Sequence, residues 1–190
     1  MQNTDFPHII CIGGSAGGIE AIKEMLIAFP APLAAPVIVA LHSVPESRLT
    51  EVLRRSSTLR IERVKEGTIP EAGVIYIVPG GRHAYLKAGA MHLSEEVTES
   101  GFRPSIDMLF MTLAAEYGNR AIAVVLSGML KDGMRGAQVI YDLGGRTVVQ
   151  TPEDAVYDSM PQSVINADHP RAVLSASDLS AWLIEEVGLL

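Results

Sequence analysis

The sequence feature that most constrains the fold is a glycine-rich turn at residues 13–18, Gly-Gly-Ser-Ala-Gly-Gly. An apolar run at residues 8–12 precedes the turn. Residues 18–29 follow it with apolar side chains three and four positions apart, which is typical of a helix. The pattern therefore predicts a strand, a tight turn and a helix, since glycine adopts positive φ without a steric penalty from Cβ. Such a turn places Ser15 at the carboxyl end of the strand, beside the free N–H groups that open the helix.

The turn also fits a nucleophile elbow, G-x-S-x-G, with Gly13 and Gly17 on either side of Ser15. A glycine-rich strand-to-helix turn can instead cradle a phosphate or have only a packing role, so phosphate or nucleotide binding stays open as an alternative. The dinucleotide fingerprint G-x-G-x-x-G does not fit this stretch, and no Gly-Lys-Ser/Thr follows it as in a P-loop. Those two absences weaken the phosphate interpretation.

Length and composition predict one globular domain spanning residues 1–190. A chain of 190 residues has room for one sizeable core, and a composition of 48% hydrophobic and 19% charged residues excludes a disordered chain. The formal net charge of -7, without a basic cluster, argues against nucleic acid as a partner and against binding to an anionic membrane. We expect no secretory signal and no membrane insertion, because the longest apolar tract, residues 26–41, is short and contains three prolines.

The chain contains one cysteine, Cys11, which lies within the first apolar run. It cannot form a disulfide within the chain, which fits a reducing compartment, so we expect a cytoplasmic protein. A catalytic role for Cys11 is an alternative, but a cysteine inside an apolar strand is more often a core residue. The five histidines show no tight metal-ligand spacing, and the sequence predicts neither a metal nor another cofactor.

Strands alternate with helices along most of the chain. Apolar runs predict further strands at residues 37–41, 59–64, 74–78, 121–126, 146–150 and 172–174. Amphipathic spacing predicts helices at residues 48–55, 105–117, 134–143, 161–167 and 177–187, with Ser47 and Ser177 as caps of the first and last, and connections at residues 30–36 and 95–101. Residues 84–86 and 91–93 flank a predicted hairpin turn. This order predicts a three-layer α/β fold, a doubly wound and mostly parallel sheet with an antiparallel hairpin at one end.

Three apolar runs end in residue types that nucleophilic acyl transfer requires: Ser15, His42 and, within a glycine-flanked loop, Asp132. Ligands of open α/β sheets bind at the carboxyl ends of the strands, so these side chains can converge if the strands are neighbours. A histidine can take the serine proton, and a carboxylate can orient the imidazole. Alternatively, His42 is a surface or core histidine and Asp132 only caps the following helix. The order Ser, His, Asp differs from that of α/β-hydrolases, so we do not expect that fold.

Several linked motifs resemble the CheB family of chemotaxis receptor methylesterases (protein-glutamate methylesterases). They occur in the family's order and spacing and cover nearly the whole chain. The matching segments are residues 12–18, 41–42, 78–83, 103–107, 126–133, 144–145, 150 and 160–161.

The resemblance implies hydrolysis of γ-glutamyl methyl esters on the cytoplasmic helices of chemoreceptors, with release of methanol. In many members it also implies deamidation of receptor glutamines. Carried over by motif, Ser15 is the nucleophile, His42 the general base and acid, and Asp132 the orienting carboxylate. Met129 matches a residue near the oxyanion, and elbow geometry makes the N–H of Ala16 a second candidate donor to it.

Two residues depart from the family pattern: Ala16 stands where a threonine commonly follows the nucleophile, and Ser43 where a methionine commonly follows the histidine. These departures leave an alternative from another class, a non-catalytic module that binds a receptor or signalling partner on the same fold. His83 and Arg103 belong to matching motifs, and we expect both to line the cleft. The alternative for Arg103 is a structural salt bridge with Asp107 or another acid.

Typical members of this family carry an N-terminal receiver domain that covers the site until it is phosphorylated. The first predicted strand begins close to Met1, so we do not expect such a domain in this sequence. Either the chain has been excised from a longer protein, or it is a stand-alone member that a separate regulatory or signalling protein controls.

Overall fold

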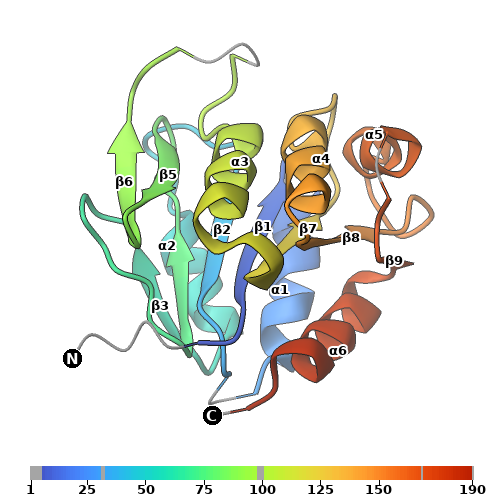
Figure 1. Cartoon of the computed structure of the whole chain (residues 1–190), viewed down its shortest axis with the longest axis horizontal. Helices are drawn as coiled ribbons and strands as arrows, with labels where there is room; N and C mark the ends of the chain where they lie inside the picture. Colours follow the sequence, from blue (N-terminus) through green and yellow to red (C-terminus); the bar gives the residue numbers. More distant parts are fainter. Residues whose placement is uncertain (1–5, 31–32, 98–100, 168, 190) are drawn as a thin grey trace.

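The centre of the molecule is a parallel sheet of seven strands. The computed structural model describes residues 6–30, 33–97, 101–167 and 169–189. Within these residues the strands follow the order β3-β4-β2-β1-β7-β8-β9 (Figure 1). They are β1 (Ile9–Gly14), β2 (Val37–Leu41), β3 (Arg60–Arg63), β4 (Val74–Ile77), β7 (Ala121–Val125), β8 (Arg146–Gln150) and β9 (Ala172–Leu174). All seven strand predictions are confirmed, whereas the predicted connections at residues 30–36 and 95–101 lie partly outside the described residues.

Helices cover both faces of the sheet, which explains why the inner strands β1, β2, β4 and β7 are buried along their whole length. In β1, Ile9 and Cys11 join one core cluster while Ile10 and Ile12 join another. The first cluster is closed by α3 (Ile106–Tyr117), α4 (Met134–Asp142) and α5 (Ser159–Ala167). The second is closed by α1 (Gly18–Ala28), α2 (Leu49–Leu53) and α6 (Ala176–Val187). The predicted three-layer architecture is confirmed (Figure 1). No helix in the described segments has the length and apolar character needed to cross a membrane.

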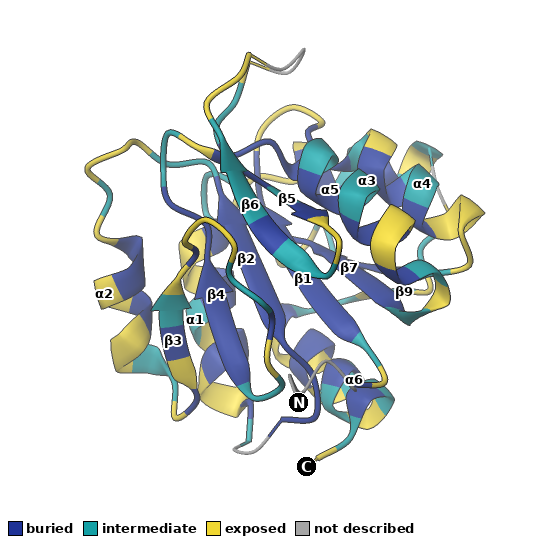
Figure 2. Ribbon diagram, turned by 60° about the vertical axis from the view of Figure 1, so that its left-hand side comes forward, coloured by how far each residue is buried: buried dark blue, intermediate teal, exposed yellow. Residues whose placement is uncertain are grey.

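The predicted hairpin forms, but as a sheet of its own. Strands β5 (His83–Lys87) and β6 (Ala90–Ser94) pair antiparallel around Ala88 and Gly89, whose φ angles of 52° and 76° suit a tight hairpin turn. The hairpin lies on the same face of the main sheet as α3 (Figure 2), and the N–H of Leu86 donates to Oγ1 of Thr112 at 3.1 Å. It therefore thickens one helical layer instead of extending the central sheet.

Helix boundaries differ from the sequence predictions where serines compete as caps. Helix α6 is capped by Ser175, whose Oγ accepts the N–H of Asp178 at 3.2 Å, so the prediction of Ser177 as the cap is wrong. Ser175 has the extended backbone of a cap, while Ser177 already lies in the first turn. Ser47 accepts the N–H of Leu49 at 3.3 Å but stands one residue outside the cap position of α2.

Candidate active site

The strands that end in Ser15, His42 and the loop of Asp132 are neighbours in the sheet. Strand β1 lies between β2 and β7, and Gly14 pairs with Leu41 across the β1–β2 ladder. All three strands run parallel, so their carboxyl ends open on the same edge. Ser15, His42 and the loop of Asp132 therefore lie at the ends of neighbouring strands, which is the condition for their side chains to converge.

Ser15 occupies the turn between β1 and α1. Gly17 has a φ of 78°, a left-handed conformation that favours glycine, and it precedes the first residue of α1. The N–H of Ser15 donates to the carbonyl of Ser127 at 2.9 Å, and its own carbonyl accepts the N–H of Gly18 at 3.0 Å. Backbone hydrogen bonds thus fix the turn on both sides and leave the hydroxyl of Ser15 to face β2.

His42 follows β2 and faces the hydroxyl of Ser15, with 3.1 Å between Nδ1 and Oγ. Its backbone N–H donates to the carbonyl of Gly14 at 3.2 Å. The imidazole stacks on the ring of Phe102, with centroids 4.4 Å apart and planes 4° from parallel. The phenyl ring therefore restricts the imidazole to one plane, a contact that no sequence pattern indicated.

Asp132 lies on the other side of the imidazole, with 2.8 Å between its Oδ2 and Nε2 of His42. Its Oδ2 also accepts the N–H of Ile106 at 2.8 Å, and Oδ1 accepts the N–H of Asp107 at 3.0 Å. The carboxylate thus sits at the start of α3, where the helix dipole favours negative charge. The alternative that Asp132 caps the following helix is wrong. The residue at the N-cap position of α4 is Gly133, which has no side chain to accept a hydrogen bond.

The tautomer follows from these contacts. With its proton on Nε2, the imidazole donates to the carboxylate of Asp132 and keeps the lone pair of Nδ1 for the hydroxyl of Ser15. The arrangement can accept a proton from Ser15 while the carboxylate compensates the charge that forms on His42.

The two candidate oxyanion donors flank this arrangement. Within the described residues, neither the N–H of Ala16 nor that of Met129 donates a hydrogen bond to the protein. Met129 follows Gly128, where a Cβ would lie only 2.9 Å from Cβ of Ser15, so the loop passes close to the serine. Two uncommitted N–H groups beside a serine are what an oxyanion hole requires.

A network of polar groups, buried at Ser127 and Gln150, supports the serine turn. The N–H of Ser127 donates to Oε1 of Gln150 at 2.8 Å, and Nε2 of Gln150 donates to Oδ2 of Asp154 at 2.8 Å. Oγ of Ser127 donates to the carbonyl of Ala16 at 2.8 Å and accepts the N–H of Tyr157 at 2.9 Å. The side chains of Ser127 and Gln150 are buried, and together they hold the peptide that carries the Ala16 carbonyl.

The prediction that His83 lines the cleft is wrong, because this residue is fully buried. Its Nδ1 accepts the N–H of Ser105 at 2.9 Å and its Nε2 donates to the carbonyl of Glu96 at 2.8 Å. Burial is the main cause that lowers the pKa of the His83 imidazole, which keeps it neutral. His83 therefore fixes the start of α3 rather than meeting a ligand.

Arg103 lies at a smaller pocket, whose lining does not include Ser15, His42 or Asp132, so a place for Arg103 in the catalytic cleft stays a prediction. It lines a space of about 440 Å³ together with Ser43 and Val44, on the His42 side of the site. Among the described residues it forms no ion pair, so the alternative of a salt bridge with Asp107 is wrong.

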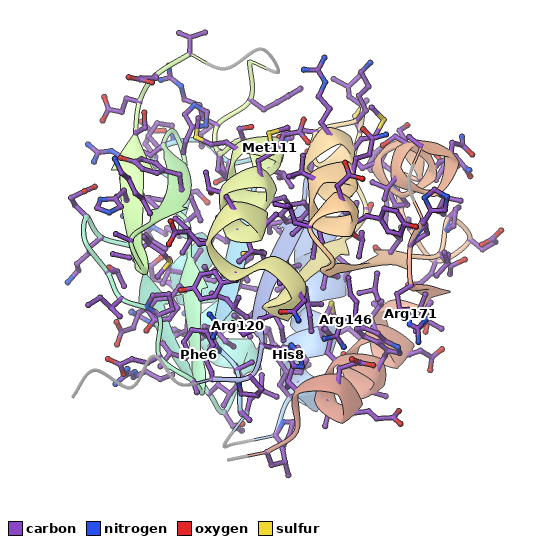
Figure 3. The ribbon with its side chains drawn as sticks, viewed as in Figure 1. Phe6, His8, Met111, Arg120, Arg146 and Arg171 are labelled. Atoms are coloured by element: carbon purple, nitrogen blue, oxygen red, sulfur yellow. The ribbon has the colours of Figure 1, made fainter. Side chains whose placement is uncertain are left out.

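A larger apolar cleft of about 870 Å³ opens beside Asp132, between α3 and α4. Its walls include Phe102, Met108, Met111 and Leu130. Figure 3 labels Met111, which lies on α3. The site thus has room for a substrate that is larger than the reacting group.

Other titratable groups lie away from this edge. Cys11 is buried in β1, and burial raises the pKa of its thiol well above the usual value, which fits the core role. His8 contacts Arg146 at the opposite end of the sheet (Figure 3). Among the described residues no three His, Cys, Asp or Glu side chains gather as a metal site would require.

Comparison with known proteins places the chain in one family. A model of the CheB methylesterase family matches residues 10–183. A protein-glutamate methylesterase/protein-glutamine glutaminase of Methanosarcina acetivorans is 32% identical over 95% of this chain and 54% of its own length. A namesake from Moorella thermoacetica is 33% identical over 93% of this chain and 43% of its own. The chain spans about half the length of the curated relatives that it matches.

A solved structure is similar throughout. The crystal structure of the Thermotoga maritima CheB methylesterase catalytic domain superimposes with a TM-score of 0.91 at 32% identity. The match covers 95% of this chain and 98% of that one. This chain therefore corresponds in length and fold to that catalytic domain, whereas it spans only about half of the curated relatives.

Proposed function

We propose that this chain, which belongs to the CheB methylesterase family, hydrolyses glutamyl methyl esters of chemoreceptors in chemotaxis-type signalling. The observation that carries the proposal is the hydrogen-bonded chain from Ser15 through His42 to Asp132. Ala16 and Ser43, the two departures from the family pattern, leave these contacts intact. The alternative of a non-catalytic binding module therefore gains no support from the site.

In the first half of the reaction, Oγ of Ser15 attacks the ester carbonyl while Nδ1 of His42 takes the hydroxyl proton. The imidazolium that forms is held by the carboxylate of Asp132 through Nε2. The N–H groups of Ala16 and Met129 donate to the developing oxyanion. When the tetrahedral intermediate collapses, His42 returns the proton to the departing methoxide, and methanol leaves.

In the second half, water attacks the glutamyl ester on Ser15, and His42 again serves as base and then as acid. The products are a free glutamate carboxylate and the regenerated hydroxyl. A glutamine side chain would follow the same route with ammonia as leaving group. The names of the curated relatives include this glutaminase activity.

The natural substrate that we propose is the methylated cytoplasmic helix of a chemoreceptor, met by this domain in the cytoplasm. A separate regulatory or signalling protein would control access to the site. No cofactor takes part in the proposed steps.

The test is methanol release from a methylated cytoplasmic receptor fragment. Ser15→Ala should reduce turnover by about three to six orders of magnitude, by analogy with other serine triads. Ser177→Ala, an exposed serine on α6, is the matched control and should keep full activity. Substantial turnover by Ser15→Ala would remove Ser15 as the nucleophile.

A further inference from the structure

Asp107 has no part in the reaction steps above, yet its carboxylate is tied to the loop that carries Asp132. Its Oδ1 accepts the N–H of Gly133 at 2.9 Å and the N–H of Gly136 at 2.8 Å. Gly133 is the cap residue of α4 and has no side chain that could satisfy these amides. Asp107, on α3, thus caps the helix that follows Asp132.

The relation between the two aspartates is reciprocal. Asp132 accepts the N–H groups of Ile106 and Asp107 at the start of α3. Asp132 thus accepts two backbone N–H groups at the start of α3, and Asp107 accepts two at the start of α4. The four hydrogen bonds join the first turns of α3 and α4, and we call this arrangement the aspartate clamp.

The clamp controls the position of the atom that contacts the imidazole. Oδ2 of Asp132 is shared between the N–H of Ile106 and Nε2 of His42, so its place depends on the start of α3. The peptide on the far side of Asp132 ends in the N–H of Gly133, which Asp107 holds. Removing Asp107 would free one side of the loop and let the carboxylate turn away from the imidazole.

We propose that Asp107 is a positioning residue for the reaction: it holds the carboxylate of Asp132 against His42. The inference rests on the proposed hydrolase function. Burial raises the pKa of the Asp107 carboxyl, and the charge of Asp132 adds to the effect, while the two glycine amides oppose it. The amides thus compensate a carboxylate that would otherwise be poorly solvated.

The test compares Asp107→Ala, which removes the acceptor, with Asp107→Asn, which keeps an oxygen at the Oδ1 position. A misplaced catalytic group costs about 10- to 100-fold in turnover. Asp107 also lines the cleft beside Asp132, but its Oδ1 is engaged by the N–H groups of Gly133 and Gly136. We therefore expect Asp107→Ala to lower kcat for methanol release by that factor and to change KM by less. Asp107→Asn should restore kcat to within about threefold of the wild type.

Ser175→Ala is the matched control, because it also removes a helix cap, that of α6, and its hydroxyl makes no contact with Asp107, Asp132 or His42. It should lower stability by a similar amount without changing kcat. The inference is overturned if folded Asp107→Ala turns over as fast as Ser175→Ala, or if Asp107→Asn is as slow as Asp107→Ala. The second result would mean that charge, and not the acceptor, matters.

Asp107→Ser provides a second variant if Asp107→Ala does not fold, since its hydroxyl is too short to reach both amides. Full turnover by folded Asp107→Ser would overturn the inference, and a loss of about tenfold would support it. The wild type separates the two proposals. If it neither releases methanol nor reacts with a fluorophosphonate at Ser15, the hydrolase function fails. If it does both and the variants match it, only the positioning role fails.

Discussion

Replacing Gln150 with leucine tests whether the buried network beneath the serine turn contributes to stability. Gln150 is 3% exposed and Ser127 is fully buried, whereas Asp154 is exposed. Leucine keeps the volume but removes the acceptor for the N–H of Ser127 and the donor to Asp154. The carboxylate of Asp154 can turn to water, but the N–H of Ser127 cannot.

The expected cost is therefore that of one buried unsatisfied amide, about 1–3 kcal/mol. A loss of about 2 kcal/mol lowers the folding equilibrium constant about 30-fold, and for a chain of this size it lowers Tm by about 4–8 °C. Urea denaturation with linear extrapolation measures the difference. Gln162→Leu is the control. It removes an exposed hydrogen bond from Nε2 of Gln162 to Oδ1 of Asn166 and should change stability by less than about 0.5 kcal/mol.

A free energy of unfolding for Gln150→Leu within about 0.5 kcal/mol of the wild type would contradict this expectation, because it would mean that the Ser127 amide finds another partner. Fluorophosphonate labelling of the same variant gives a second readout. Since Ser127 holds both the N–H of Ser15 and the carbonyl of Ala16, we expect slower labelling in the folded variant.

Further predictions concern the site and the pH dependence of stability. Gly128→Ala should slow labelling of Ser15 by about 100-fold, because the new Cβ would collide with Sδ of Met160 and lie 2.9 Å from Cβ of Ser15; a rate like that of the wild type would contradict this close packing. Phe102→Ala removes the ring that stacks on His42 and should lower kcat by about tenfold, measured by methanol release; an unchanged kcat would show that the ring is dispensable. Burial lowers the pKa of His83, so its contribution to stability is present above pH 6.5 and is lost as the pH falls through the folded-state value. His83→Leu should reduce the dependence of stability on pH below pH 6.5, measured by urea denaturation. An unchanged dependence would mean that His83 is not its cause.

Local patterns were sufficient to predict the strands and the turn. The run before Ser15 is apolar on both faces, and the glycines after it permit only a few backbone paths, so neither depends on distant residues. The convergence of Ser15, His42 and Asp132 needed one further condition, the adjacency of β1, β2 and β7. Ligands of open α/β sheets bind at the carboxyl ends of the strands, so the sequence could indicate this edge as the site but not the order of the strands.

The parts that sequence could not supply depend on which groups meet across the fold. Asp107 and Asp132 each lie near a helix start. The sequence predicted Asp132 as the carboxylate that orients His42, with a helix cap as its alternative. It indicated Asp107 only as a salt-bridge partner of Arg103. Their exchange of amides requires α3 and α4 to begin side by side, which only the packed structure reveals. Phe102 follows a polar stretch and carried no signal, and its contact with His42 joins residues that are distant in sequence.

The choice between Ser175 and Ser177 failed for a different reason. Both serines precede apolar helical residues, and cap preference does not separate two serines that lie two positions apart. The extended backbone of Ser175, after the short strand β9, decides it. Boundaries of this kind are set by the preceding element.

Treating the protein with a fluorophosphonate and identifying the modified residue by mass spectrometry shows directly whether Ser15 is an activated nucleophile. Stable modification requires a serine with an aligned base, whatever the natural substrate. We expect a single phosphonylated residue, Ser15, with labelling abolished in His42→Ala. Labelling at another serine, or none in the folded wild type, would contradict the assignment of Ser15 as an activated nucleophile.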